Sequence, residues 1–373
     1  MAFARIEPCL ERVHEAETPR RTDLERLLGL TDPADIERLF DFADEVRRRH
    51  VGDAIPVRAI VEFSNHCRNR CAYCGLQAGN AVLERYRLDA GQVLKAAGRV
   101  ADMGIGTVVL QSGEDPRMPA EWLGEVIERI KTRFDMAVTL SVGERSRDDY
   151  TLWRRCGANR YLLKIETGVP DRYERLHPAM SFENRRRCLK DLAELGYQVG
   201  SGIIVGLRGQ TIATLADDII FLKACGLDMV SVGPFIPHPH TALGGQPAAD
   251  LMLTLKALAV ARILMPDAHM PATTALAYLD GVDRRAAALA AGANVIMVKC
   301  TPYEVRRLYD IYPGGAPVDA DTAATLAQLE ATASILGRQL DYSRGDCIRT
   351  LRGPLPPSIC QPGYYAGKIT NAM

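Results

Sequence analysis

Three cysteines within eight residues, Cys67, Cys71 and Cys74, constrain this chain more than any other feature. Their C-x3-C-x2-C spacing places three soft thiolates in one short loop, and such thiolates hold zinc or iron–sulfur clusters. A structural zinc site takes four protein ligands, whereas a 4Fe–4S cluster held by three thiolates leaves one iron open. The apolar run 60–63 predicts a strand just before the loop. The cysteines should therefore lie at the C-terminal end of a strand, where α/β barrels carry their chemistry.

The residues alone leave a second interpretation of this loop open. His66 could act as a fourth ligand and complete a structural zinc site, although adjacent residues such as His66 and Cys67 chelate one ion poorly. No second C-x2-C pair follows downstream. Tyr73, between the last two cysteines, suits an aromatic ring that packs beside an open iron. We therefore favour the iron–sulfur cluster over zinc.

Charge and hydropathy exclude several classes of partner. The 46 basic and 46 acidic residues cancel, so nothing in the composition favours nucleic acid as a partner. No window of about 18 apolar residues predicts a membrane span. The first residues lack the apolar core of a signal peptide, and ten cysteines without such a signal indicate a reducing compartment. We therefore expect a cytoplasmic protein.

A regular alternation of apolar runs and helical patterns predicts an α/β fold, a complete (β/α)8 TIM barrel. Residues 1–50 are charged and helical, which predicts an N-terminal helical extension, and residues 51–318 would form the barrel. Residues 319–373 would add a C-terminal helix and an irregular tail. The eight expected strands are 60–63, 107–111, 137–141, 161–166, 199–205, 229–232, 270–274 and 295–298.

The ends of these strands supply the candidate site residues, because a barrel carries function at its C-terminal face. On the fourth strand, alternation puts Arg160, Lys164 and Glu166 on one face. Buried charges are costly unless they are paired or bind a ligand, so we favour a polar substrate site over a structural ion-pair network. The other candidates at strand ends are Gln111, Ser112, Gly113, Glu114, Thr139, Ser141, Ile204, Gly206, Thr273, Thr274 and Cys300. Gly113 and Gly206 would allow the backbone to approach a ligand closely.

The cysteine loop with Tyr73, followed by Ser112-Gly113-Glu114, resembles the radical S-adenosylmethionine (radical SAM) superfamily. The resemblance implies a 4Fe–4S cluster whose open iron binds the amine and carboxylate of S-adenosylmethionine. It also implies an external reductant, such as a flavodoxin or ferredoxin. An electron from the cluster would cleave S-adenosylmethionine into methionine and a 5′-deoxyadenosyl radical.

Longer stretches resemble the iron-only hydrogenase maturases of the HydE type, with biotin synthases and methylornithine synthases as relatives. These stretches are 62–65, 109–116, 160–163, 181–185, 233–239, 271–275 and 292–297. The resemblance implies that Glu166 and Arg185 hold the ribose and carboxylate of S-adenosylmethionine. It implies that Arg160, Thr139, Thr273 and Thr274 line the pocket of a small, amino-acid-derived substrate, such as a cysteine-bound iron complex.

Two departures from the HydE pattern leave the substrate open. Lys164-Ile165 stands where the family usually has Arg-His, and Lys299-Cys300 stands where it usually has Asn-Trp. Lysine does not replace arginine in a bidentate grip on a carboxylate. No cysteines occur at 321–324, so we expect no second cluster. A HydE-like paralogue with another small substrate and a zinc-stabilised, non-catalytic barrel remain alternatives.

Overall fold

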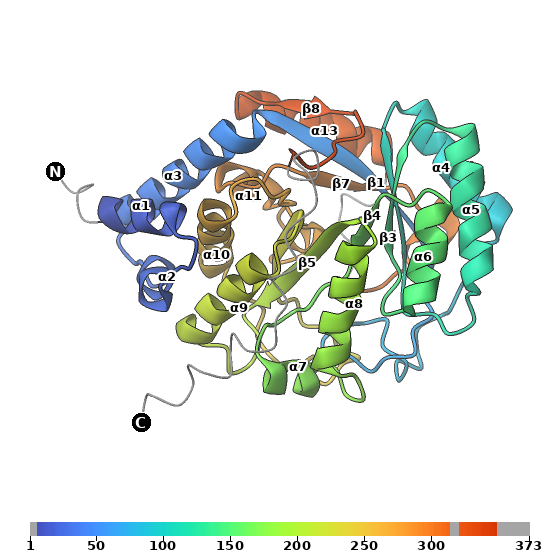
Figure 1. The fold of residues 1–373 in the computed structure, drawn as a ribbon, viewed down its shortest axis with the longest axis horizontal. Helices are drawn as coiled ribbons and strands as arrows, with labels where there is room; N and C mark the ends of the chain where they lie inside the picture. Colours follow the sequence, from blue (N-terminus) through green and yellow to red (C-terminus); the bar gives the residue numbers. More distant parts are fainter. Residues whose placement is uncertain (1–5, 314–320, 349–373) are drawn as a thin grey trace.

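The computed structural model describes residues 6–313 and 321–348. Three helices precede the sheet: α1 (Glu7–Glu15), α2 (Arg21–Leu28) and α3 (Pro33–Val51). The Asp32 side chain accepts hydrogen bonds from the first turn of α3, and Pro33 occupies its first position, which needs no amide hydrogen. These helices pack on the outer helices of the sheet at one side of the molecule (Figure 1).

A curled parallel sheet forms the centre of the fold. Its strand order is β6-β5-β4-β3-β2-β1-β7, and each neighbouring pair is parallel. The strands are β1 (Ala54–Ser64), β2 (Thr107–Ser112), β3 (Ala137–Ser141), β4 (Arg160–Leu162), β5 (Gln198–Val205), β6 (Met229–Pro234) and β7 (Ile296–Lys299). The α/β class is therefore confirmed.

The regular eight-strand barrel is not formed. The expected strand 270–274 is reduced to single parallel bridges, from His269 to Met229 and from Pro271 to Val295. The short helix η2 (Thr274–Ala277) begins where that strand was expected to end. Pro271 has no amide hydrogen to donate to a ladder, which helps to explain why only bridges form here. The result is a curled seven-strand sheet whose edges meet through these bridges.

Helices cover the outer face of the sheet (Figure 1). One of them begins with a capping box, in which the side chains of Asp89 and Gln92 each accept a hydrogen bond from the other's backbone amide. The outer helices are α4 (Ala90–Asp102), α5 (Ala120–Arg133), α6 (Arg147–Arg155), α7 (Pro170–Leu176), α8 (Phe182–Glu194), α9 (Ile212–Ala224), α10 (Leu251–Leu264), α11 (Arg285–Ala290), α12 (Tyr303–Arg306) and α13 (Thr322–Ile335).

After α13 the chain returns to the bottom of the sheet. The short strand β8 (Gln339–Asp341) pairs in parallel with the first residues of β1. Residues 342–347, which we call the floor segment, then cross beneath the strands, with contacts to β1, β2, β4, β5 and β6 or to residues next to them. Most of the predicted irregular tail, residues 349–373 including Cys360, lies outside the described part.

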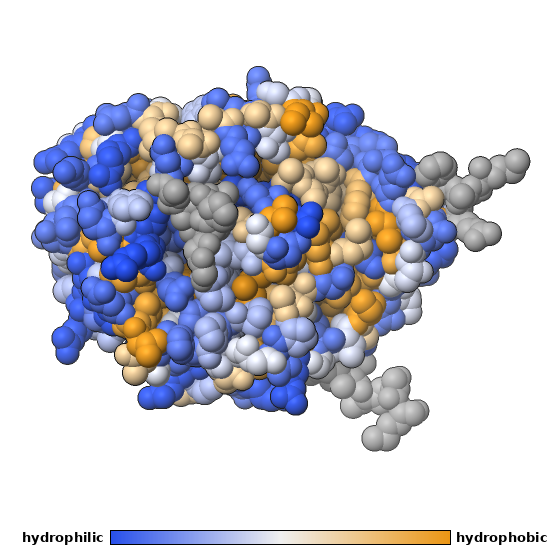
Figure 2. Space-filling view, turned by 180° about the vertical axis from the view of Figure 1, so that it is seen from behind, coloured by the Kyte–Doolittle hydropathy of each residue, from blue (hydrophilic) through white to orange (hydrophobic). Residues whose placement is uncertain are grey.

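No helix in the described ranges is long and apolar enough to cross a membrane. On the face drawn in Figure 2, hydrophobic residues form separate groups between hydrophilic ones.

Candidate functional site

A cavity of about 320 Å³ opens at the C-terminal ends of the strands and reaches down between them. The cysteine loop, residues 65–77, forms part of its wall through Cys67, Tyr73 and Cys74. Side chains from several strand ends converge here, as expected for a barrel-type site. Of the residues expected from the sequence, the cavity is also lined by Gln111, Ser112, Glu114, Thr139, Ser141, Lys164, Glu166, Arg185, Ile204, Thr273 and Thr274.

The cysteine loop is held at both ends by one arginine. Nη1 of Arg85 donates to the carbonyl oxygens of Asn65 at 2.6 Å and Leu76 at 2.9 Å. Burial raises the pKa of the Cys74 thiol to about 12, with a further contribution from Cys67. Burial also raises the pKa of Cys71, and Cys74 and Cys67 reinforce the shift because all three thiols lie near one another.

The three cysteines fit a cluster better than a single ion. In the described ranges, no three His, Cys, Asp or Glu side chains are grouped as ligands of one metal ion. In a 4Fe–4S cluster each thiolate binds a different iron, so the sulfur atoms need not converge on one point. Three thiols that lie near one another in a partly buried loop match the three irons that the protein would hold in such a cluster.

Glu166 combines a strained backbone with a buried carboxylate oxygen that has no hydrogen-bond partner. Its φ is 63°, a left-handed conformation that non-glycine residues seldom adopt. The backbone is locked there, because its amide donates to Gly202 and its carbonyl accepts from Ile204. The side chain is buried, and Oε2 has no hydrogen-bond partner. Burial raises the pKa of Glu166, although nearby Lys164 and Arg185 act to lower it. Strain and an unsatisfied buried oxygen of this kind are typical of a binding site.

The proton of the Tyr73 hydroxyl is directed away from Glu166. Nδ1 of His177 lies 2.8 Å from the carbonyl oxygen of Tyr173, an acceptor only, so Nδ1 must carry a hydrogen. Burial lowers the pKa of His177 to about 3, and Arg185 adds to the shift, so the ring is neutral. Nε2 then accepts from the Tyr73 hydroxyl at 3.0 Å, while Oε1 of Glu166 lies 3.5 Å away. The carboxylate of Glu166 thus remains available to a ligand.

Two carboxylates and two arginines form a chain beside the cysteine loop. Nε of Arg68 donates to Glu114, whose other oxygen accepts from the backbone amide of Glu144 at 2.8 Å. Glu144 in turn accepts from Nε of Arg185 at 2.7 Å, and Arg185 also donates to the carbonyl oxygen of Lys164. Glu144, which the sequence analysis did not single out, therefore orients Arg185.

The opposite part of the cavity offers hydroxyl and ammonium groups. The buried Oγ1 atoms of Thr139 and Thr273 have no hydrogen-bond partner. Lys164 enters from the end of β4, and Lys299 enters from β7, where its Nζ donates to the Tyr278 hydroxyl at 3.0 Å. Both lysines lie at positions where the sequence departs from the HydE pattern.

Arg58 forms part of the deep end of the cavity and was missed from the sequence. Its guanidinium contacts Nδ1 of His269 at 2.6 Å and donates to Sδ of Met229 at 2.9 Å, but Nε has no partner. Burial and the neighbouring Arg160 lower the pKa of Arg58 to about 9. The period-two pattern that puts Arg58 and Glu62 on one face of β1 was a signal that could have identified it.

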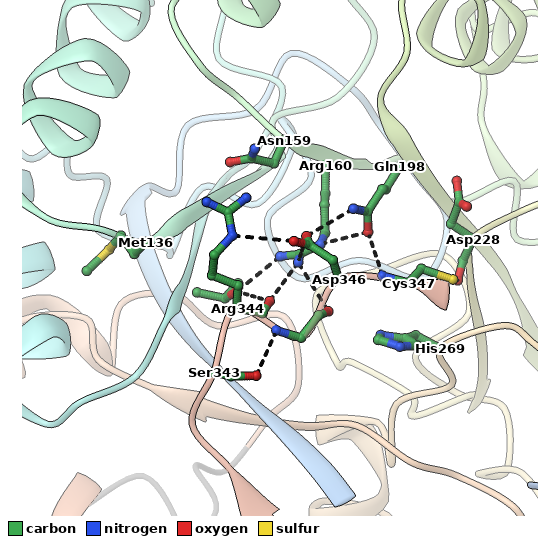
Figure 3. Close-up of polar contacts among 12 residues, drawn as sticks. Met136, Asn159, Arg160, Gln198, Asp228, His269, Ser343, Arg344, Asp346 and Cys347 are labelled. Atoms are coloured by element: carbon green, nitrogen blue, oxygen red, sulfur yellow. Dashed lines mark hydrogen bonds and ion pairs between the residues drawn. The ribbon is translucent and has the colours of Figure 1, made fainter. Parts of the chain in front are cut away.

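Arg160 does not reach the cavity, contrary to the prediction. Figure 3 shows that it belongs to the barrel floor, where it meets the floor segment. Its Nη2 donates to the carbonyl oxygen of Arg344 at 2.6 Å and to Oδ1 of Asp346 at 2.5 Å. Its Nη1 donates to Thr107, and its Nε donates to Gln198. Arg160 is the first residue of β4. Alternation along the strand correctly predicted the face on which the Arg160 side chain lies, but not how far it lies from the C-terminal ends of the strands.

Three further candidates lie away from the cavity. The amide of Cys300 donates to Ile60, and its thiol lies near Arg306 and Thr322, toward the outer layer. A Cβ on Gly113 would come within 2.9 Å of the Cβ of Cys67, so this glycine admits the cysteine loop rather than a ligand. A Cβ on Gly206, whose φ is 88°, would meet Ala249. Close packing between protein segments explains both glycines.

Comparison with known proteins extends the sequence resemblance. Residues 61–222 match the model of the Radical SAM superfamily. The FeFe hydrogenase maturase subunit HydE of Thermotoga maritima is 44% identical over 330 residues, which are 88% of this chain and 94% of that protein. The 3-methylornithine synthase of Methanosarcina acetivorans is 28% identical over 289 residues, 77% of this chain and 81% of that protein.

Two solved structures have a similar fold. The crystal structure of methylornithine synthase has a TM-score of 0.79 at 26% identity, covering 89% of this chain and 97% of that one. The hydrogenase maturase HydG has a TM-score of 0.76 at 20% identity, covering 93% of this chain and 77% of that one. The likeness to HydG is one of fold.

Proposed function

Because the chain belongs to the radical SAM superfamily and, within it, to the family of the hydrogenase maturase HydE, we propose that it acts on a small amino-acid-derived substrate during maturation of the iron-only hydrogenase cofactor. The chain is a radical SAM enzyme, and its cofactors are a 4Fe–4S cluster and S-adenosylmethionine. When bound and reduced, the cluster with S-adenosylmethionine supplies a 5′-deoxyadenosyl radical. The observation that carries the proposal is Glu166, which has a left-handed backbone and a buried, unpartnered Oε2 and lines the cavity beside the cysteine loop.

The residues of the cavity divide into two groups with different roles. Cys67, Cys71 and Cys74 would hold three irons, since a thiolate binds each iron that the protein ligates. Around them Glu114, Glu166 and Arg185 would hold S-adenosylmethionine, and Glu144 would fix the direction of Arg185. The hydrogen-bonded, left-handed backbone at Glu166 fixes the point from which its side chain extends, and Oε2 has no protein partner that a ligand would have to displace.

The second group would hold the substrate. Unpartnered hydroxyls on Thr139 and Thr273, with Thr274 next to them, can donate to a carboxylate or another anion. Lys164 and Lys299 add positive charge from two walls of the cavity. A small anionic substrate would thus sit deeper than S-adenosylmethionine, and the walls around both would exclude water from a reactive radical.

Anaerobic reconstitution tests the first step. The chain should bind about four irons, as one 4Fe–4S cluster requires, and should form 5′-deoxyadenosine from S-adenosylmethionine under reduction. Cys71→Ala should abolish both, while the matched control Cys156→Ala, on the outside of the sheet, should retain both. One zinc per chain without cleavage would refute the proposal and restore the zinc-stabilised barrel.

A HydE-like paralogue with a different small substrate is the second candidate, and Lys164 and Lys299 favour it. Both replace residues usual in the family and both line the cavity, so the groups that meet the substrate differ from those of the family pattern. Expression in cells that lack their own maturase separates the two functions. Restored hydrogenase activity supports maturation, and failure despite 5′-deoxyadenosine formation in vitro supports the paralogue.

A further inference from the structure

A buried carboxylate outside the cavity, Asp218 of α9, holds the turn that follows Glu166. The Asp218 side chain is fully buried and does not line the cavity. Its Oδ1 accepts two hydrogen bonds of 2.7 Å, one from the hydroxyl of Thr167 and one from the backbone amide of Gly168. These two residues directly follow Glu166 in the chain. One oxygen of Asp218 therefore fixes the backbone immediately after a residue expected to bind S-adenosylmethionine.

The same helix packs directly on this turn. A Cβ on Gly168 would lie 2.6 Å from the Cβ of Phe221, which belongs to α9, so the backbone of the turn lies against the helix. On its other side, Glu166 is bonded to β5 through both its amide and its carbonyl group. The left-handed backbone of Glu166 is thus held between β5 and a turn that α9 fixes.

The second oxygen of Asp218 connects the turn to the end of β5. Oδ2 accepts a hydrogen bond from Nε2 of Gln210 at 3.2 Å. The same nitrogen donates to the carbonyl oxygen of Ile204 at 3.0 Å, and Oε1 of Gln210 accepts from the amide of Gly206 at 2.7 Å. Ile204 lines the cavity. Asp218 therefore links the segment that carries Glu166 to a second part of the cavity wall.

Asp218 faces a buried arginine as well as these donors. Nη1 of Arg172, on α7, lies 3.9 Å from Oδ2 and has no hydrogen-bond partner. Burial raises the pKa of Asp218 to about 6, although the hydrogen bonds from Thr167 and Gly168 and the charge of Arg172 act to lower it. The group is therefore ionised at about pH 7.5, where both of its oxygens act only as acceptors.

We propose that Asp218 is a positioning residue for S-adenosylmethionine, which acts through the turn 167–168 on the carboxylate of Glu166. The inference rests on the proposed function, in which Glu166 holds S-adenosylmethionine. Asp218 fixes the point from which the Glu166 side chain extends into the cavity. Hydrogen bonds to a charged group are short and directional, so a shift of this turn weakens them.

The first test replaces Asp218 by alanine, which removes both contacts of the turn. Equilibrium binding of S-adenosylmethionine to the reconstituted, unreduced enzyme should weaken by about 10-fold or more, the loss that corresponds to one hydrogen bond to a charged group. KM for S-adenosylmethionine should rise in proportion, while kcat at saturation stays within about three-fold. Asp218→Asn should restore most of the affinity, because its amide oxygen can still accept from both donors of the turn.

A double-variant cycle separates positioning from a general loss of stability. In the Glu166→Gln background, Asp218→Ala should weaken S-adenosylmethionine binding by no more than about two-fold further, because the group through which it acts is already altered. Thr167→Val removes one of the two hydrogen bonds at nearly constant size. It should weaken binding in the same direction, and it supplies the test if Asp218→Ala does not fold.

Asp228→Ala is the matched control. Asp228 lies at the barrel floor (Figure 3), where its Oδ2 accepts from the backbone amide of Val199 at 2.9 Å. It is buried, as Asp218 is, and it does not line the cavity. Asp228→Ala should therefore lower the free energy of unfolding, measured in urea, but leave S-adenosylmethionine binding unchanged.

Three results would overturn the proposal. The first is normal S-adenosylmethionine binding by both Asp218→Ala and Thr167→Val. The second is an equal loss of binding in Asp228→Ala, and the third is an undiminished effect of Asp218→Ala in the Glu166→Gln background. Normal binding by Glu166→Gln alone would refute the role proposed for Glu166 and this inference with it. Absence of S-adenosylmethionine cleavage in the unmodified enzyme would instead refute the proposed function.

Discussion

Replacing Arg160 by methionine distinguishes a residue that holds the barrel floor from one that binds substrate. The guanidinium is fully buried and donates to Thr107, Gln198 and three residues of the floor segment. Removing one partner of a buried ion pair costs about 3–5 kcal/mol. The side chain of Asp346 is 29% exposed, so water takes over part of its solvation. We therefore expect the free energy of unfolding to fall by about 2–4 kcal/mol.

Urea denaturation followed by circular dichroism measures this loss. Arg155→Met serves as the control, since substitution of an exposed side chain usually changes stability by less than about 0.5 kcal/mol. Combining Arg160→Met with Asp346→Ala should give less than the sum of the two single losses, because both remove the same pair. Trypsin should also cut more rapidly after Arg344, since the floor segment has lost its main anchor.

The catalytic outcome is the opposite of that expected for a substrate residue. 5′-Deoxyadenosine formation per folded molecule should stay within about two-fold of the unmodified enzyme, because Arg160 lies outside the cavity. If Arg160→Met keeps its full stability and instead loses turnover, the assignment of Arg160 to the floor is wrong.

Three further predictions concern single residues. Glu166→Gln should lower S-adenosylmethionine cleavage by at least about 10-fold while leaving the free energy of unfolding equal or higher, because the substitution removes a buried charge whose Oε2 atom has no hydrogen-bond partner; parallel kinetic and urea measurements check this. Cys300→Ala should leave 5′-deoxyadenosine yield unchanged, since the thiol lies toward Arg306 and Thr322; a loss of yield would place it in the site. Burial and Arg58 hold the pKa of His269 well below 6.5. As pH falls below 6.5, His269 therefore becomes protonated in the unfolded chain while it stays neutral in the folded protein. Stability should therefore fall by about 1.4 kcal/mol per pH unit as pH drops below about 5.5, and His269→Gln should show a slope smaller by that amount in urea titrations at several pH values.

Local sequence patterns predicted most of the sheet and its helices. The run 137–141 is β3 as the structure has it, and Asp89 and Gln92, three residues apart, form a capping box. These features depend on period-two burial and on hydrogen bonds within one turn, which neighbours in the chain largely decide. The expected strand 270–274 failed because a strand exists only if its neighbours pair with it, and here they supply single bridges.

Glycine positions show where local reasoning about the site stops. Gly113 and Gly206 were expected to admit a ligand, but they admit the cysteine loop and Ala249. A glycine in the sequence indicates that another group packs closely against the backbone, and only the folded structure shows whether that group is a ligand or another part of the protein. The importance of Glu144 and His177 was equally hidden, because each acts on a side chain that is distant in the sequence.

The sequence by itself determined the initiating chemistry, because three thiolates in eight residues are kept near one another by covalent connection alone. It also predicted that Arg160 and Lys164 share a face, since side chains alternate along a strand, although β4 itself ends at Leu162. Only the tertiary structure decided their depth. Four residues of extended chain span about 13 Å, enough to put Lys164 in the cavity and Arg160 at the floor. The partner that holds Arg160 there, Asp346, lies 186 residues further along the chain, and only folding brings it beneath the sheet.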